Sequence, residues 1–302
     1  MKEEILDVTE PRSSIAAILP TLLGILFSIY EFGISNISLL SAFIFLIVVI
    51  FMQLSVNVWN NIADFKHNTK DWQNSYNNSL KNGKQSEKLA YIILLITAAI
   101  SFVGGMILVV TNKFGLTILF IGILGAMVAF FYSGTKFAIS NSPFGELASG
   151  VTMGFLILFG VVLSAGNQLS NLLIVKIVIL SIMPVMAIAN IMFANNMSDR
   201  LEDEKQGRKT LVYYLGIKKS LNLFSAMYFV GYGFLLIAIV FKIIPATSLL
   251  VLFSLFPVIK NIKIFKKNQI KSKTFILSIQ NAAIITITLL IGILLGVIFN
   301  VR

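Results

Sequence analysis

The sequence predicts an all-α fold, a polytopic membrane bundle of nine transmembrane helices, and three observations support this prediction. Hydrophobic residues make up 57% of the 302 residues and charged residues only 12%. The mean hydropathy is +0.89, and a soluble domain would carry about 25% charged residues. The hydrophobic residues also occur in stretches of about 20, the length of a membrane-spanning helix, and not in the short alternating segments of a β-barrel.

Nine such stretches follow one another, and we expect residues 1–302 to form a single membrane-embedded domain. The predicted helices cover residues 15–33, 37–63, 88–110, 114–132, 144–166, 170–198, 220–241, 244–260 and 275–299. The second and the sixth are longer than a bilayer requires, and both become polar at their C-terminal ends. The first follows an acidic segment that lacks a small-residue cleavage site, which favours a retained helix over a signal peptide.

Lys and Arg are divided unequally between the loops on the two sides of the predicted bundle. One side holds 20 of the 24 basic residues. Because basic residues concentrate in cytoplasmic loops, we expect a cytoplasmic N-terminus and an outer C-terminus in the cell (plasma) membrane. This topology accounts for the net charge of +11, so the charge does not indicate a nucleic-acid partner.

The acidic residues indicate where the chemistry lies. Zero cysteines and a single histidine exclude thiolate and multi-histidine metal sites. Six of the 13 acids lie in two short segments, 64–71 and 199–204, of the predicted cytoplasmic loops about 60–87 and 195–219. Each loop begins with Asn-Asn-x-x-Asp, and at 100° per residue the polar residues around each copy share one helix face. These residues are Asn57, Asn60, Asn61, Asp64, Asn68 and Asp71 in the first segment, and Asn195, Asn196, Asp199 and Asp203 in the second.

Aligned carboxylates repel one another unless a cation joins them. Mg²⁺ prefers oxygen ligands and is usually held by one or two carboxylates together with substrate phosphates. Two facing helices of this kind therefore predict Mg²⁺ ions around a diphosphate, with basic neighbours as further donors. A single acidic pair is more often a solvated helix end, whereas the duplication favours a site.

On these motifs the chain resembles the UbiA superfamily of intramembrane aromatic prenyltransferases. The first motif of that family, N-D-x-x-D-x-x-x-D, is matched by Asn60, Asn61, Asp64 and Asn68. Its second motif, D-x-x-x-D, is matched by Asp199 and Asp203. The segments 132–134 (Tyr-Ser-Gly) and 143–147 (Pro-Phe-Gly-Glu-Leu) resemble one branch, the 1,4-dihydroxy-2-naphthoate polyprenyltransferases of menaquinone biosynthesis. The resemblance covers most of residues 10–216.

The resemblance implies a cavity at the centre of the bundle, open toward the cytoplasmic side, and an Mg²⁺-dependent prenyl transfer. A polyprenyl diphosphate would donate the prenyl group to an aromatic acceptor, with 1,4-dihydroxy-2-naphthoate as the closest match. The implied catalytic residues are Asp64, Asp199, Asp203 and Asn60. The implied metal ligands are Asp64, Asp71, Asn68, Asp199 and Asp203. The implied substrate-binding residues are Asn57, Asn195, Asn196, Lys205, Arg208, Lys209, Arg12, Tyr132, Lys136 and Glu146.

The match to the first motif is incomplete, because Asn61 and Asn68 replace aspartates. Asp71 lies one turn beyond Asn68 on the same face, and we expect it to substitute as a ligand. The number of Mg²⁺ ions, the prenyl chain length and the oligomeric state stay open.

Two kinds of alternative also remain. The acceptor could be 4-hydroxybenzoate, homogentisate, haem or a glyceryl phosphate. From another class, the protein could be a membrane transporter, but transporters keep ionisable groups near the bilayer midplane. No Asp, Glu, Lys or Arg lies in the central turns of the predicted spans, which favours the enzyme.

Overall fold

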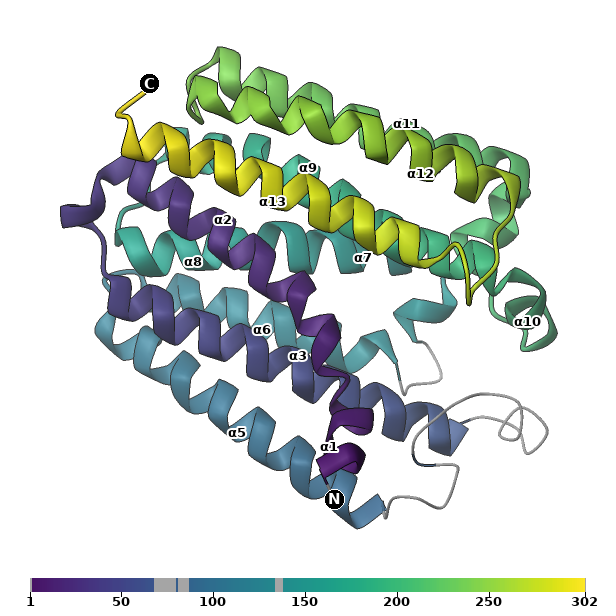
Figure 1. Cartoon of the computed structure of the whole chain (residues 1–302). Coiled ribbons are helices and arrows are strands. Elements are labelled where there is room, and N and C mark those ends of the chain that lie inside the picture. Colours follow the sequence, from purple (N-terminus) through teal and green to yellow (C-terminus); the bar gives the residue numbers. More distant parts are fainter. Residues whose placement is uncertain (1, 68–79, 81–86, 134–137, 302) are drawn as a thin grey trace.

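A computed structural model describes residues 2–67, 80, 87–133 and 138–301 of this chain. Within these residues the secondary structure is helical, without strands, and nine segments are long and apolar enough to cross a membrane. The predicted fold class is therefore confirmed. The helices run roughly side by side along one direction (Figure 1).

The first half of the chain contains the helices that carry the first motif. They are α1 (Lys2–Thr9), η1 (Pro11–Ser14), α2 (Ile15–Phe32), η2 (Ile34–Asn36), α3 (Leu39–His67), α5 (Glu87–Thr111) and α6 (Gly115–Tyr132). Helix α3 extends past the predicted membrane boundary and includes Asn57, Asn60, Asn61 and Asp64.

The second half contains the helices that carry the second motif. They are η3 (Ile139–Asn141), α7 (Gly145–Gly150), η4 (Val151–Leu156), α8 (Ile157–Gly166), α9 (Asn171–Ser198), α10 (Arg200–Lys205), α11 (Leu211–Val240), η5 (Ala246–Ser254), α12 (Leu255–Lys267) and α13 (Ile276–Ile298). Asn195 and Asn196 lie in the last turn of α9, and Asp203 lies in the short helix α10.

Two predicted spans differ from the observed helices. Helix α11 begins at Leu211 and not near residue 220, with a break at Gly216, whose φ is +69°. The eighth span begins as the 3₁₀ helix η5 and continues as α12 to Lys267, beyond the predicted residue 260. The two extensions into basic segments have one cause: lysines favour helix formation, and their long side chains reach water from a helix end, so hydropathy alone makes the predicted helices too short.

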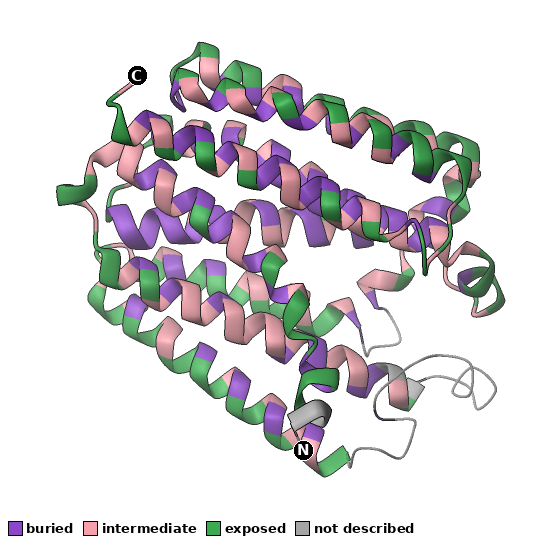
Figure 2. Ribbon diagram, viewed as in Figure 1, coloured by how far each residue is buried: buried purple, intermediate pink, exposed green. Residues whose placement is uncertain are grey.

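Helix α9 forms the centre of the bundle. In its most apolar 18-residue window 56% of the residues are buried, against 11% in α6. It packs against α11, α7, η4 and α13, and its Phe193 lies in the main core with Phe224, Tyr228 and Phe265. Exposed residues are frequent on the outer helices α5 and α12 (Figure 2).

Two glycines allow α7 and η4 to approach α9 closely. A Cβ atom on Gly154 would lie 2.5 Å from the backbone nitrogen of Val185, and one on Gly150 would lie 2.7 Å from the Val185 carbonyl oxygen. The approach occurs beside Pro184, inside α9, and η4 is a π-helix. Such bulges are common at functional sites, and this contact places α7 against the end of α9 that carries the second motif.

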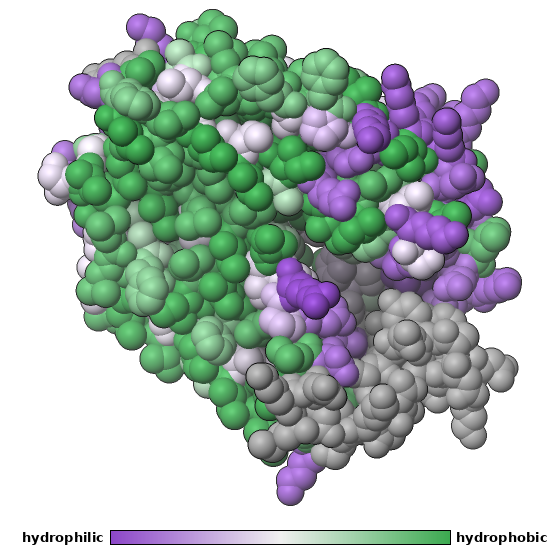
Figure 3. Space-filling view, in the orientation of Figure 1, coloured by the Kyte–Doolittle hydropathy of each residue, from purple (hydrophilic) through white to green (hydrophobic). Residues whose placement is uncertain are grey.

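The C-terminal ends of α3 and α9 lie at the same end of the bundle, together with α10 and residues 268–275 (Figure 1). We call this region the polar end. Hydrophilic residues gather there, and the surface is hollowed beside them, whereas the body of the bundle is covered by apolar side chains (Figure 3). A central cavity behind this hollow stays a prediction.

Candidate active site

The second motif forms an ion-pair network with a lysine from a distant loop. Lys271, between α12 and α13, places its Nζ 2.5 Å from Asp199 Oδ2. The same ammonium donates to Asn195 Oδ1, and Asn195 Nδ2 donates to Asp199 Oδ2 at 3.2 Å. Asn195 and Asp199 are one helical turn apart, so their oxygens can share one cation.

Asp203 lies deeper than Asp199 and is paired with Arg208. Arg208 Nη1 forms an ion pair with Asp203 Oδ1 at a distance of 3.0 Å, and only 3% of Asp203 is exposed. Burial raises the pKa of Asp203 to about 6, although Arg208 opposes this shift. Asp203 Oδ2 is buried and has no hydrogen-bond partner among the described residues. A desolvated carboxylate with one unsatisfied oxygen is a suitable ligand for a cation.

The loop after α10 is held against η3. Arg208 donates to the Ser140 carbonyl oxygen at 3.2 Å, and the Lys209 backbone N–H donates to the Asn141 carbonyl oxygen at 3.0 Å. The guanidinium of Arg208 therefore contacts both η3 and the Asp203 carboxylate, and these two contacts hold Arg208 in place.

Glu146 and Asn196 join α7 to α9. Asn196 Nδ2 donates to Glu146 Oε1 at 2.9 Å, and both residues are buried. Glu146 Oε2 has no hydrogen-bond partner among the described residues. Tyr132, at the C-terminal end of α6, lies within electrostatic range of Glu146 and Arg208. The structure thus brings three predicted substrate-binding residues close to the second motif.

The first motif has different partners. Asn57 donates to the Thr9 carbonyl oxygen and to Ser13 Oγ, both at 2.7 Å, and accepts from Gln53 Nε2 at 3.0 Å. Asn61 donates to the Val8 carbonyl oxygen at 3.1 Å. These amides therefore attach the N-terminal segment to α3. The Asn57 amide, for which we predicted substrate binding, forms these structural hydrogen bonds.

For most of the remaining predicted site residues the structure gives a position or an exposure but few contacts. Asn60 lies in α3, and its Oδ1 is buried without a partner among the described residues. Asp64 also lies in α3, but its side chain is outside the described part of the chain, as are Asn68, Asp71 and Lys136. The side chains of Arg12, Lys205 and Lys209 are exposed.

Sequence reasoning missed Lys271 as a site residue. In the sequence it is one of six lysines in a predicted cytoplasmic loop, and all six match the positive-inside pattern equally well. Only the packing of α13 against α9 and α12 places this lysine, and not its neighbours, beside Asp199.

The donor set fits Mg²⁺ that is shared with a phosphate ligand. Within the described residues no group of three His, Cys, Asp or Glu side chains could hold a metal alone. The polar end nevertheless offers hard oxygen donors, and Asp203 Oδ2 and Asn60 Oδ1 are buried without a hydrogen-bond partner in the part of the chain that the structure describes. Mg²⁺ commonly takes one or two carboxylates and completes its shell with substrate phosphates and water.

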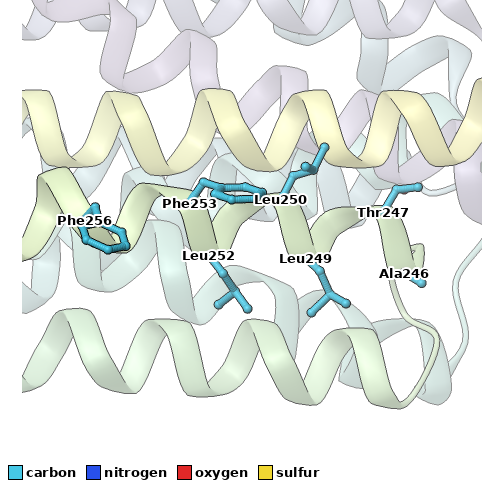
Figure 4. A pocket seen from close by; sticks show the side chains of 7 residues that line it. All are labelled: Ala246, Thr247, Leu249, Leu250, Leu252, Phe253 and Phe256. Carbon is cyan, nitrogen blue, oxygen red and sulfur yellow. The ribbon is translucent and has the colours of Figure 1, made fainter.

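A second concave region lies on η5 and does not belong to this site. The groove has a volume of about 610 Å³ and is lined by Leu249, Leu252, Phe253, Phe256 and three neighbours (Figure 4). Phe253 and Phe256 are 74% and 86% exposed. An apolar, open surface of this kind suits lipid chains and offers no ligand for a diphosphate.

Comparison with known proteins identifies the family. The model of the UbiA prenyltransferase family matches residues 17–279. The chain belongs to this family. It is similar to the 1,4-dihydroxy-2-naphthoate octaprenyltransferase of Bacillus subtilis, with 27% identity over 230 residues, covering 75% of this chain and 70% of the relative.

Solved structures of UbiA homologues share the fold. A homologue from Aeropyrum pernix K1 has a TM-score of 0.73 at 19% identity, covering 94% of this chain and 98% of that one. A homologue from Archaeoglobus fulgidus, bound to GPP and Mg²⁺, has a TM-score of 0.59 at 16% identity, covering 97% and 99%. The protein is thus a membrane prenyltransferase, which confirms the predicted reaction class.

Proposed function

We propose that this UbiA prenyltransferase transfers a polyprenyl group from an isoprenyl diphosphate to 1,4-dihydroxy-2-naphthoate, with Mg²⁺, in menaquinone biosynthesis. The observation that supports it most is the second motif, in which Asp199 and the buried Asp203 present oxygens at the polar end beside Lys271 and Arg208. The Bacillus relative supports the acceptor, and the Archaeoglobus complex supports the diphosphate and the metal.

Acidic and amide residues of the chain would bind the metal, and basic residues would bind the diphosphate. Asp199, Asn195 and Asp203 supply oxygen ligands on one side, and Asn60, Asp64 and Asp71 supply them from the first motif. Lys205, Arg208 and Lys209 offer donors to the phosphate oxygens. When bound, Mg²⁺ neutralises the diphosphate and stabilises it as a leaving group.

The acceptor occupies the side of the site that faces α7. Glu146, Asn196 and Tyr132 form a polar group next to the second motif and orient the ring that attacks the allylic carbon. Arg12 and Lys136 neutralise the acceptor's carboxylate. The new bond joins the ring to the allylic carbon as the bond from that carbon to the diphosphate oxygen breaks and diphosphate leaves. The ring regains its aromaticity as the acceptor's carboxylate leaves as CO₂.

A panel of acceptors tests the proposal. Purified protein is incubated with Mg²⁺, geranylgeranyl diphosphate and each acceptor in turn, and products are identified by mass spectrometry. We expect prenylated naphthoate that has lost CO₂. Product with 4-hydroxybenzoate, homogentisate, haem or a glyceryl phosphate alone would move the assignment to that acceptor, and no pyrophosphate release with any of them would contradict the whole proposal.

Asp71→Ala tests the altered first motif. If Asp71 substitutes for the aspartate that Asn68 replaces, the variant needs a higher Mg²⁺ concentration for half-maximal activity. An unchanged Mg²⁺ requirement would show that Asp71 is not a ligand, and the activity of Asp64→Ala then decides whether Asp64 serves alone.

The topology is also a proposal: the polar end faces the cytoplasm of a cell whose plasma membrane holds the protein. The chain contains no cysteine, so single-cysteine labelling is direct. In intact cells an impermeant maleimide should label Lys242→Cys, between α11 and η5, but not Lys273→Cys, between α12 and α13. The reverse pattern would invert the topology.

A further inference from the structure

Lys271 is held in place by its own loop. Thr274 Oγ1 accepts from the Ile270 backbone N–H and donates to the Asn268 carbonyl oxygen, both at 2.8 Å, and Thr274 is buried. The Lys271 ammonium also lies 5.1 Å from the centre of the Phe275 ring, a distance suited to a cation–π contact. The position of this ammonium beside α9 is therefore built into the fold.

The ammonium contacts the oxygens that a metal ion would use. Asn195 Oδ1 and Asp199 Oδ2 both accept from Lys271 Nζ, and the 2.5 Å separation from Asp199 leaves no room for a second cation between them. An amide oxygen and a carboxylate oxygen one turn apart are hard ligands. A lysine ammonium is a compact point charge on a flexible stem, so it can hold such a position and also leave it.

We propose that Lys271 is a placeholder for Mg²⁺: it occupies the cation position of the second motif in the metal-free enzyme and is displaced when the metal binds. This inference rests on the proposed function, because it takes Asp199 as a metal ligand. Lys271 is a positioning residue that keeps the Asp199 carboxylate and the Asn195 amide oriented and neutralised until the metal arrives.

A placeholder and a simple structural clamp predict opposite effects on metal affinity. Loss of a clamp disorders the ligands and weakens metal binding. Loss of a placeholder removes a competing positive charge and strengthens it. A partly exposed ion pair contributes up to about 1 kcal/mol, which corresponds to an affinity change of up to about fivefold.

Direct metal binding provides the test. Mn²⁺ replaces Mg²⁺ as a spectroscopic probe, and electron paramagnetic resonance measures free Mn²⁺ over full-length purified protein without substrate. We expect Lys271→Met to lower the Mn²⁺ dissociation constant about three- to fivefold, and Lys271→Arg, which keeps the charge, to stay within about twofold of the native protein. Lys273→Met, an exposed lysine of the same loop, is the matched control and should change nothing. An unchanged or raised dissociation constant in Lys271→Met, with native thermal unfolding, would overturn the proposal.

Asp199→Ala separates this inference from the proposed function. If Asp199→Ala binds Mn²⁺ less tightly but Lys271→Met does not bind it more tightly, the placeholder is wrong and the metal site stands. If Asp199→Ala binds Mn²⁺ as the native protein does, both fail. If Lys271→Met binds Mn²⁺ more tightly but the native protein prenylates no acceptor, the placeholder role stands and the proposed reaction fails.

Discussion

The two Asn-Asn-x-x-Asp segments are alike in sequence and different in their contacts. On α9, Asn195 and Asp199 contact an ammonium from a distant loop. On α3, Asn57 and Asn61 donate to the N-terminal segment. In the described part of the chain, Asp199 of one segment contacts a cation, whereas Asn57 and Asn61 of the other donate mainly to backbone carbonyls.

The difference shows that the amides of two similar segments can have different contacts. Asp199 and Asp203 carry negative charge that basic groups balance, so this copy can exchange a protein cation for a metal ion. Asn57 is uncharged, and its amide forms hydrogen bonds within the fold. We therefore expect changes at the second motif to affect chemistry first, and changes at Asn57 to affect stability first.

The largest expected effect is at Asp203. Asp203→Ala removes the buried carboxylate that we propose as a metal ligand, and prenyl transfer should fall at least about 100-fold, the scale of losing one transition-state contact. Product formation at saturating Mg²⁺ measures it. Glu202→Ala, at an exposed neighbour on α10, is the control and should retain activity. Full activity in Asp203→Ala would exclude the residue from the metal site.

Asn57→Ala should destabilise the fold by about 1–3 kcal/mol, because the Thr9 carbonyl and Ser13 hydroxyl lose a buried donor. Thermal unfolding of the purified protein measures the loss. Asn36→Ala, which removes an exposed side-chain bond to the Phe32 carbonyl, should be close to neutral. If Asn57→Ala instead abolished Mn²⁺ binding at native stability, Asn57 would act in metal binding, as we propose for the second motif, and not in stability.

Metal affinity should depend on pH through Asp203. Burial raises its pKa to about 6, and only the deprotonated carboxylate binds a cation. As the pH falls through 6, protons displace the metal, so the Mn²⁺ affinity should fall about tenfold for each further pH unit. Above pH 7 it should change little. Asp203→Asn should bind more weakly but without this pH dependence, and an identical profile in both proteins would assign the dependence elsewhere.

The smallest expected effect is at Asn61. Its bonds to the Val8 carbonyl and Glu10 carboxylate are 3.1 and 3.4 Å long, and the second is exposed. Asn61→Ala should therefore cost about 0.5–1 kcal/mol, less than Asn57→Ala. Thermal unfolding of the two variants in parallel checks the order, and a larger loss at Asn61 would reverse it.

Much of the fold could be predicted because membrane spans are a property of local composition. Each long apolar run must become a helix, since the bilayer offers no partner to unpaired backbone groups. The helix ends were less predictable: α11 and α12 extend into basic segments that hydropathy scores as loops. The 3₁₀ geometry of η5 and the π-helical geometry of η4 depend on packing, and no local pattern in the sequence predicts them.

Residue type and short-range spacing in the sequence are enough to predict the membrane-spanning helices, the family motifs and the acids that we propose for the chemistry. What those residues contact depends on the tertiary structure. It placed Lys271 on Asp199 across 72 positions of the chain, Glu146 on Asn196 and the N-terminal segment on Asn57. Such contacts follow from how the helices pack, and the sequence does not show which lysine of a lysine-rich loop will contact a carboxylate.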